Sequence, residues 1–150
     1  MDKLLSLLKN FDSGNFMPEM DRFVSQLAGW LRLILLAAPL VLLVLGFCYY
    51  YAPPDEANYS AGYRTKASMR SVASWQFAQR YAGKTYAKVG AVLGGVMLVL
   101  SLFFGLMGPL AMAVVTLLCI LVEAVLILLV YRHIDRKIQS KFDKNGEPRR

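Results

Sequence analysis

Very few side chains in this sequence lie in a setting where they could do chemistry. Glu123 is the clearest candidate, because it is the single charge in an apolar stretch that covers residues 89–131. Thr116, Cys119 and Glu123 follow one another at helical spacings, so they share one face of a helix. A carboxyl group in an apolar span needs a partner or a proton, so we expect this face to point into a helix bundle.

Three interpretations of Glu123 stay open. Arg64, reaching back from a connecting loop, could pair with it, since a planar guanidinium favours carboxylate acceptors. A neutral Glu123 could instead be hydrogen-bonded within its own or an adjacent helix, or it could serve a proton relay, for which one carboxylate is little support. Arg64 itself could bind a lipid phosphate or an acidic partner, or it could fix the loop to backbone carbonyls.

The sequence gives no basis for an enzyme active site, a cofactor or a metal centre. His133 stands alone beside Arg132 and Asp135, and no serine or cysteine is paired with a base by a motif. Cys48 and Cys119 lie in apolar runs without metal-ligand spacing, which is typical of small packing residues. The net charge of +7 arises from basic residues that flank the apolar runs, so we expect no direct nucleic-acid partner.

Two long apolar stretches predict an all-α membrane protein. The chain has 150 residues, 57% of them hydrophobic. An uncharged run over residues 33–51, extended backwards past Arg32, predicts a first transmembrane helix over residues 27–51. The second stretch, 43 residues over 89–131, would form a helix of ~65 Å, too long for a hydrocarbon core of ~30 Å. Gly108-Pro109 lies near its middle, where proline disfavours a continuing helix. We therefore expect a transmembrane hairpin, formed by residues 89–107 and 110–131.

The distribution of basic residues predicts the orientation. Three crossings place the N-terminal segment 1–26 on one side of the membrane, and the loop 52–88 and the tail 132–150 on the other. Thirteen lysines and arginines lie in the loop and tail, against four on the opposite side. The positive-inside rule then places the loop and the C-terminus in the cytoplasm and the N-terminus outside. We expect the tail to be a solvated segment that can touch anionic lipid.

The two segments that flank the first span are the least regular. Residues 1–26 could form an interfacial helix or a frayed terminus, and Pro18 should limit any helix that continues past it. In the loop, Thr65 or Ser68 is expected to cap an interfacial cytoplasmic helix over residues 66–82, between the first and second transmembrane helices. We expect three aromatic residues of the loop to anchor it at the headgroup level, namely Tyr63, Trp75 and Tyr81.

Small residues predict close helix packing at the start of the hairpin. Gly90 and Gly94 form a GxxxG motif, and Gly95 widens the same face. The partner could be the first span, the third span or another copy of the chain.

The loop also carries a pattern of glycine, aromatic, hydroxyl and basic residues that is followed by two apolar spans. Its members are Asn58, Gly62, Tyr63, Arg64, Thr65, Ser68, Trp75, Gln79, Arg80, Gly83 and Lys84. This pattern, over about residues 58–131, resembles the SdpI family of bacterial membrane proteins. The resemblance implies a multi-pass protein of the bacterial inner membrane that confers immunity to a secreted peptide toxin, or bacteriocin. It also implies a signalling role, because the best-known and longer member holds a transcriptional repressor at the membrane.

Three hypotheses of function follow. The leading one is a non-enzymatic immunity protein in the lipid bilayer that uses the loop motif to bind a peptide toxin or a cytoplasmic regulator. The second is a structural or accessory subunit that assembles through its glycine face, including with another copy of itself. The third is a small transporter in which Glu123 is an ion or proton site.

Overall fold

Three long helices make up most of the protein. The computed structural model describes residues 13–54 and 61–149, and its long helices are α2 (Ser13–Tyr51), α3 (Val72–Phe103) and α4 (Pro109–Lys141). Two short 3-10 helices flank α3, namely η1 (Ser68–Arg70) and η2 (Phe104–Leu106). No strand occurs among these residues, so the predicted all-α fold is confirmed.

Each long helix contains a segment that is long and apolar enough to cross a membrane. These segments are Arg22–Tyr51, Val72–Phe103 and Leu110–Lys141, which confirms the prediction of three spans. Large apolar side chains such as Trp30, Leu102 and Leu128 are mostly exposed on the outside of the bundle. Continuous apolar surface of this kind is costly in water and is the normal outer surface of a protein in lipid.

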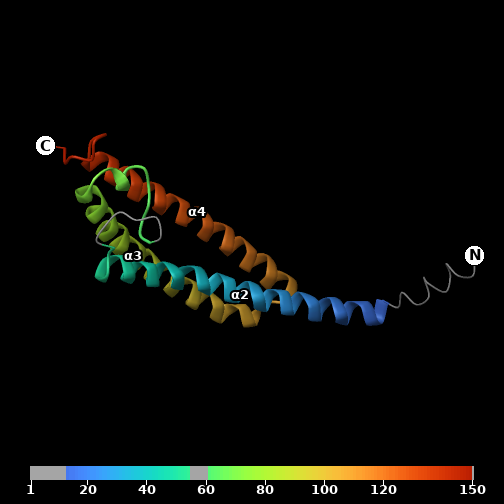
Figure 1. Cartoon of the computed structure of the whole chain (residues 1–150). Coiled ribbons are helices and arrows are strands. Elements are labelled where there is room, and N and C mark those ends of the chain that lie inside the picture. Colours follow the sequence, from blue (N-terminus) through green and yellow to red (C-terminus); the bar gives the residue numbers. More distant parts are fainter. Residues whose placement is uncertain (1–12, 55–60, 150) are drawn as a thin grey trace, which may run out of the picture.

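The helices are not packed evenly against one another. α2 lies most closely against α3, while α4 contacts α2 more than it contacts α3. Figure 1 shows α4 meeting α2 near the hairpin turn and diverging from it toward the other end, where residues 61–70 lie between α4 and the other two helices. We call these the hairpin end and the loop end of the bundle. The first part of α2 extends past the hairpin end (Figure 1).

Two apolar clusters form the core, one at each end of the bundle. At the hairpin end, Leu35, Met97 and Phe104 bring together α2, α3 and η2. The guanidinium group of Arg32 lies over the Phe104 ring, 5.1 Å from its centre, which is a cation–π geometry. At the loop end, the larger cluster joins all three helices to the loop, and its members include Leu42, Tyr63, Ala67, Ala78, Ala82, Ile134, Ile138 and Phe142.

The hairpin turn has the reversal that the sequence predicts. α3 ends at Phe103, η2 follows, and Gly108 in an extended conformation precedes α4, which begins at Pro109. Proline suits the first turn of a helix because the N–H that it lacks has no intrahelical partner there. The same residue that prevents one long helix therefore starts the next one.

α2 begins earlier than we expected. It starts at Ser13 and continues through Pro18, so the prediction that Pro18 limits this helix is wrong. Pro18 is the sixth residue of α2, past the four N–H groups that have no helical acceptor, so the helix continues there without one backbone hydrogen bond. The leucine-rich part of the N-terminal segment lies outside the described residues.

Residues 66–82 do not form a separate interfacial helix. Residues 72–82 are the first turns of α3, which continues without a break to Phe103. The cap is also different from the predicted Thr65 or Ser68: the Ser71 hydroxyl accepts from the backbone N–H of Ser74, and the Ser74 hydroxyl accepts from that of Ser71. This reciprocal capping box satisfies two N–H groups at the helix start, which no single hydroxyl upstream could do.

The start of the basic tail is helical and not merely solvated. α4 continues to Lys141 because Ile134, Ile138 and Phe142 recur every fourth residue and are buried against the loop end of the bundle. Residues 142–149 then fold back as a hook. Phe142 forms an isolated β-bridge with Pro148, and the Ser71 hydroxyl donates to the Gly146 carbonyl at 2.6 Å.

Candidate functional site

The loop motif is built around a pair of hydrogen bonds between Tyr63 and Gln79. The backbone N–H of Tyr63 donates to Oε1 of Gln79 at 2.7 Å, and Nε2 of Gln79 donates to the Tyr63 carbonyl at 3.1 Å. Gln79 is fully buried and Tyr63 is 3% exposed. The Gln79 amide thus satisfies both backbone groups of Tyr63, as a neighbouring strand does in a β-sheet. These two bonds fix the loop to α3.

Gly62 and Trp75 complete this contact. Gly62 has a φ of +101°, and a Cβ there would lie 2.9 Å from both Gln79 Oε1 and a ring carbon of Trp75. Glycine is therefore required for both its conformation and its small size. Trp75 is completely buried, and its indole N–H donates to the Pro54 carbonyl at 2.8 Å. Trp75 therefore contacts both Pro54, which follows the end of α2, and Gly62 of the motif.

The hydroxyl residues of the motif bond to one another and to the loop backbone. The Ser68 hydroxyl donates to the Tyr63 carbonyl at 3.0 Å and accepts from the N–H of Thr65 at 2.8 Å. The N–H of Ser68 in turn donates to Thr65 Oγ1 at 3.1 Å, and the Ser74 hydroxyl donates to the Ser68 carbonyl at 3.0 Å. These buried polar groups are satisfied internally, so they stabilise the loop.

Tyr63 connects the loop to α4. Its hydroxyl donates to the Tyr131 carbonyl at 3.0 Å, and its ring lies 5.4 Å from the ring of Tyr131 and 6.1 Å from that of Tyr86. Burial raises the pKa of Tyr63 well above its ordinary value, so this phenol stays protonated and remains a donor. Tyr63 and Trp75 are therefore internal clamp residues, whereas we expected their rings to be exposed to the headgroups.

We call the set of residues that fasten the loop to α3 and α4 the clamp. Its members are Gly62, Tyr63, Thr65, Ser68, Ser71, Ser74, Trp75, Gln79 and Tyr131. Sequence reasoning missed Ser71, Ser74 and Tyr131 as parts of it. Two serines three residues apart before an apolar run are a usable signal for a helix start. Tyr131 takes part through its backbone carbonyl, which leaves no mark in the sequence.

The small residues place α3 directly against α2. A Cβ on Gly83 would lie 2.7 Å from the backbone nitrogen of Tyr50, and a Cβ on Gly90 would lie 2.7 Å from that of Leu43. The sequence left the partner of this face open, and for Gly83 and Gly90 the partner is the first span. Gly94 meets only the Pro39 ring, at 3.6 Å, and a Cβ on Gly95 would have no neighbour within 4 Å.

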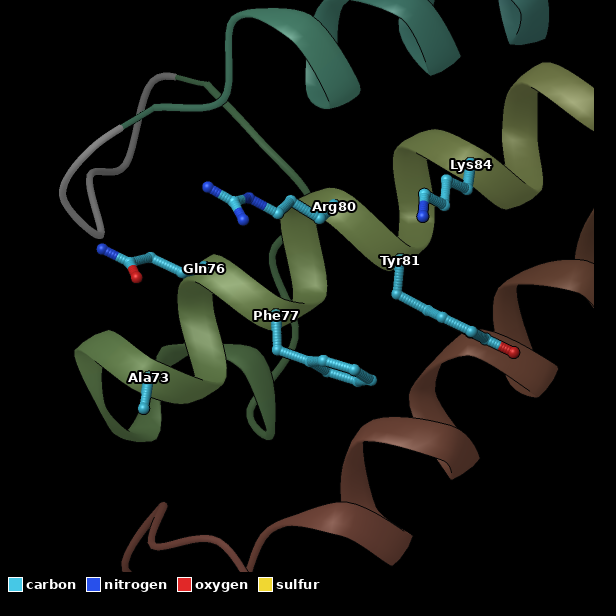
Figure 2. A pocket seen from close by; sticks show the side chains of 6 residues that line it. All are labelled: Ala73, Gln76, Phe77, Arg80, Tyr81 and Lys84. Atoms are coloured by element: carbon cyan, nitrogen blue, oxygen red, sulfur yellow. The ribbon is translucent and has the colours of Figure 1, made fainter.

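The motif cations Arg80 and Lys84 are not part of the clamp, and both are exposed. They line a shallow hollow of about 430 Å³ together with Gln76, Phe77 and Tyr81. Figure 2 shows Phe77 and Tyr81 pointing toward α4, and Gln76 and Arg80 pointing away from it. We call these five residues the basic face.

α4 extends the basic face. The Lys141 ammonium lies over the Phe77 ring, 4.3 Å from its centre, and the Tyr81 hydroxyl is 3.1 Å from Nε2 of His133. These contacts hold two aromatic rings in place between cations at the loop end. The arrangement can bind an anionic group, since charge-assisted hydrogen bonds are among the stronger ones that a surface offers. One motif residue, Asn58, lies outside the described residues.

The intramembrane polar face points inward. Thr116 is buried, and its hydroxyl donates to the Met112 carbonyl one turn earlier at 2.7 Å. Glu123 is only 2% exposed and lies on α4 between the two apolar clusters. Its Oε1 atom is buried and has no hydrogen-bond partner among the described residues. Arg64 is exposed at the loop end, and its pairing with Glu123 stays a prediction.

Comparison with known proteins gives one match. No curated protein and no solved structure matches the chain significantly. Within residues 13–54 and 61–149, no three histidine, cysteine or acidic side chains come together in a way that could hold a metal ion. The model of the SdpI/YfhL protein family matches residues 56–131, just over half of the chain, and this stretch contains the whole clamp and both cations of the basic face. The chain therefore belongs to the SdpI/YfhL protein family.

Proposed function

We propose that this protein is a non-enzymatic immunity protein of the bacterial cytoplasmic membrane, and that it protects its cell against a secreted peptide toxin. The observation that carries the proposal is the family match over the clamp and the two hairpin spans, residues 89–131. Three apolar helices supply the membrane location that such a role needs.

The basic face is the surface that we assign to partner binding. Most polar groups of the motif are hydrogen-bonded within the clamp. Arg80 and Lys84, in contrast, remain exposed beside Phe77 and Tyr81. Exposed cations next to fixed aromatic rings suit a partner with acidic side chains, either the toxin itself or a cytoplasmic regulator that reports on it. The clamp then has a supporting role, because it fixes the start of α3 on which this face lies.

Toxin challenge of living cells tests this proposal. A strain that lacks the gene should be sensitive to its cognate toxin, and the wild-type protein should restore growth. The double variant Arg80→Gln/Lys84→Gln should lose most of this protection. The matched double variant Lys137→Gln/Lys144→Gln removes two exposed cations elsewhere at the loop end and should keep it. Unchanged toxin sensitivity after deletion of the gene, with normal membrane levels of protein before deletion, contradicts the proposal.

The orientation that we propose follows the positive-inside rule. The loop end, which carries the basic face, lies in the cytoplasm, and the hairpin turn lies outside. Single cysteines at Gly108 and Ser140, both exposed, report on the two ends in a background without Cys48 and Cys119. In intact cells an impermeant maleimide should label Gly108→Cys alone. Labelling of Ser140→Cys alone would invert the topology.

A second function is favoured by one observation: within the part of the chain that the structure describes, the buried Oε1 atom of Glu123 has no hydrogen-bond partner. In a transporter this carboxyl group would bind and release a proton or cation within the span. Flux through proteoliposomes tests it: wild-type protein should dissipate a proton gradient, and Glu123→Gln should abolish this flux. Equal flux for both proteins, or none for the wild type, rules the transporter out.

A further inference from the structure

A groove lies between α2 and α4 and extends along α2 to the loop end of the bundle. The two helices diverge in this direction (Figure 1). The groove has a volume of about 700 Å³, which is within the range of small-molecule sites, ~300–1,000 Å³. All three helices and the loop contribute to its walls. Its lining residues are Ile34, Ala37, Ala38, Val41, Leu42, Leu45, Tyr49, Gly62, Tyr63, Arg64, Tyr86, Ile127 and Tyr131.

The chemistry of the lining changes along the groove. The α2 wall from Ile34 to Leu45 is entirely apolar and, at ~1.5 Å per residue, about 17 Å long. Four tyrosines follow toward the loop end, and Tyr131 carries the carbonyl that Tyr63 binds. Arg64 is the single charged residue of the lining and lies at the loop end beside Tyr49. The groove is therefore apolar along α2, is lined by phenol rings nearer the loop end, and has one positive charge at that end.

We propose that this groove binds one anionic phospholipid from the leaflet at the loop end. An acyl chain lies along the α2 wall, the glycerol region is level with the tyrosine rings, and the phosphate contacts the Arg64 guanidinium. Each part of the lipid matches the groove residues beside it. Acyl chains favour apolar walls, and tyrosine rings favour the level of the headgroups. Arginine binds phosphate through parallel N–H groups. This proposal does not rest on the immunity function.

A transmembrane peptide is the competing occupant, and the groove favours the lipid. A helix is ~10–12 Å across with its side chains, whereas the groove has the volume of a small-molecule site. The single positive charge at one end of the groove also complements the one negative charge of a phospholipid headgroup, whereas a transmembrane peptide need not carry a negative charge there. The clamp holds Tyr63 rigidly beside Arg64, so the headgroup position exists before the lipid arrives.

Native mass spectrometry tests the proposal directly. The full chain is reconstituted into nanodiscs of phosphatidylcholine and phosphatidylglycerol in equal parts and then released into mild detergent. We expect the wild-type protein to retain one phosphatidylglycerol. Arg64→Gln should reduce its retention about tenfold, because a charge-assisted contact to phosphate is lost. Lys88→Gln, which removes an exposed cation outside the groove, should leave retention unchanged.

A second variant tests the apolar wall. Val41 is half-exposed in the groove, so Val41→Phe should fold normally and block the acyl chain without changing the charge. Loss of the lipid in both Arg64→Gln and Val41→Phe, with retention in Lys88→Gln, supports the proposal. Equal retention in all four proteins overturns it, as does equal retention of phosphatidylcholine. A peptide that copurifies and is displaced only by Val41→Phe would assign the groove to a helix and also overturn it.

Discussion

Tyr63 and Gln79 hold each other through two reciprocal hydrogen bonds in a fully buried position, one 2.7 Å and the other 3.1 Å long. The oxygen of the Gln79 amide accepts from the Tyr63 N–H, and one N–H of the same amide donates to the Tyr63 carbonyl. A loop that joins two membrane spans would otherwise have to satisfy these backbone groups with water. This pair therefore explains how the loop becomes part of the helix bundle.

Gln79→Leu should destabilise the protein. Leucine has a similar size, but it leaves the N–H of Tyr63 buried without an acceptor, which costs ~1–3 kcal/mol. The Tyr63 carbonyl also loses one of its two donors and keeps the Ser68 hydroxyl. We expect the free energy of unfolding to fall by about 2 kcal/mol or more, measured by denaturation in detergent followed by circular dichroism. The control is Gln76→Leu, one turn earlier on the exposed side of α3. Equal stability of the two variants would show that the clamp contributes little.

Two glycines of α3 should respond in opposite directions to alanine. A Cβ on Gly90 would lie 2.7 Å from the Leu43 nitrogen and 2.8 Å from the Pro39 carbonyl oxygen, so Gly90→Ala must push α2 away, at ~1–3 kcal/mol. Gly95→Ala meets no atom within 4 Å and should stabilise the helix by ~0.5–1 kcal/mol. Unfolding in increasing dodecyl sulfate measures both changes. A stable Gly90→Ala protein would contradict the observed contact between α2 and α3.

The C-terminal hook should open at low pH. Backbone N–H groups of Glu147 and Asn145 donate to Oδ1 of Asp143 at 2.8 and 2.9 Å, and the Glu147 bond is the main cause of a lowered pKa for Asp143. Because the folded hook favours the ionised carboxylate, its stabilisation is complete above the unfolded pKa of ~3.9 and is lost as the pH falls through the lower folded pKa.

The amide resonance of Gly146 measures this opening, since the Gly146 carbonyl is held by Ser71 in the closed hook. We expect the resonance to shift cooperatively below about pH 4, below the ordinary pKa of an aspartate. Asp143→Asn keeps a side-chain acceptor but cannot ionise, so its shift should disappear. The same transition in both proteins would assign the pH dependence to another group.

The sequence predicts the broad architecture well and the site poorly, for physical reasons. Long uncharged runs and Gly108-Pro109 determine the three spans and the reversal, because lipid thickness and proline geometry act locally. The burial of Trp75 and Tyr63 depends on how the loop docks against α3 and α4, which is tertiary information. The helical spacing of Ile134 and Ile138 is a signal for the extension of α4. The basic residues on the other faces of this helix favoured a solvated tail instead.

Glu123→Leu should stabilise the protein. The carboxyl group is 2% exposed and its Oε1 atom has no hydrogen-bond partner among the described residues, so folding pays its desolvation without full compensation. Leucine removes this penalty at similar volume, and we expect the free energy of unfolding in detergent to rise by ~1–3 kcal/mol. Thr116→Val is the control, since the Thr116 hydroxyl is already bonded within its own helix and its loss should change little. A destabilised Glu123→Leu protein would instead mean that the carboxylate has a partner, and Arg64→Gln combined with it in a double-mutant cycle would show whether that partner is Arg64.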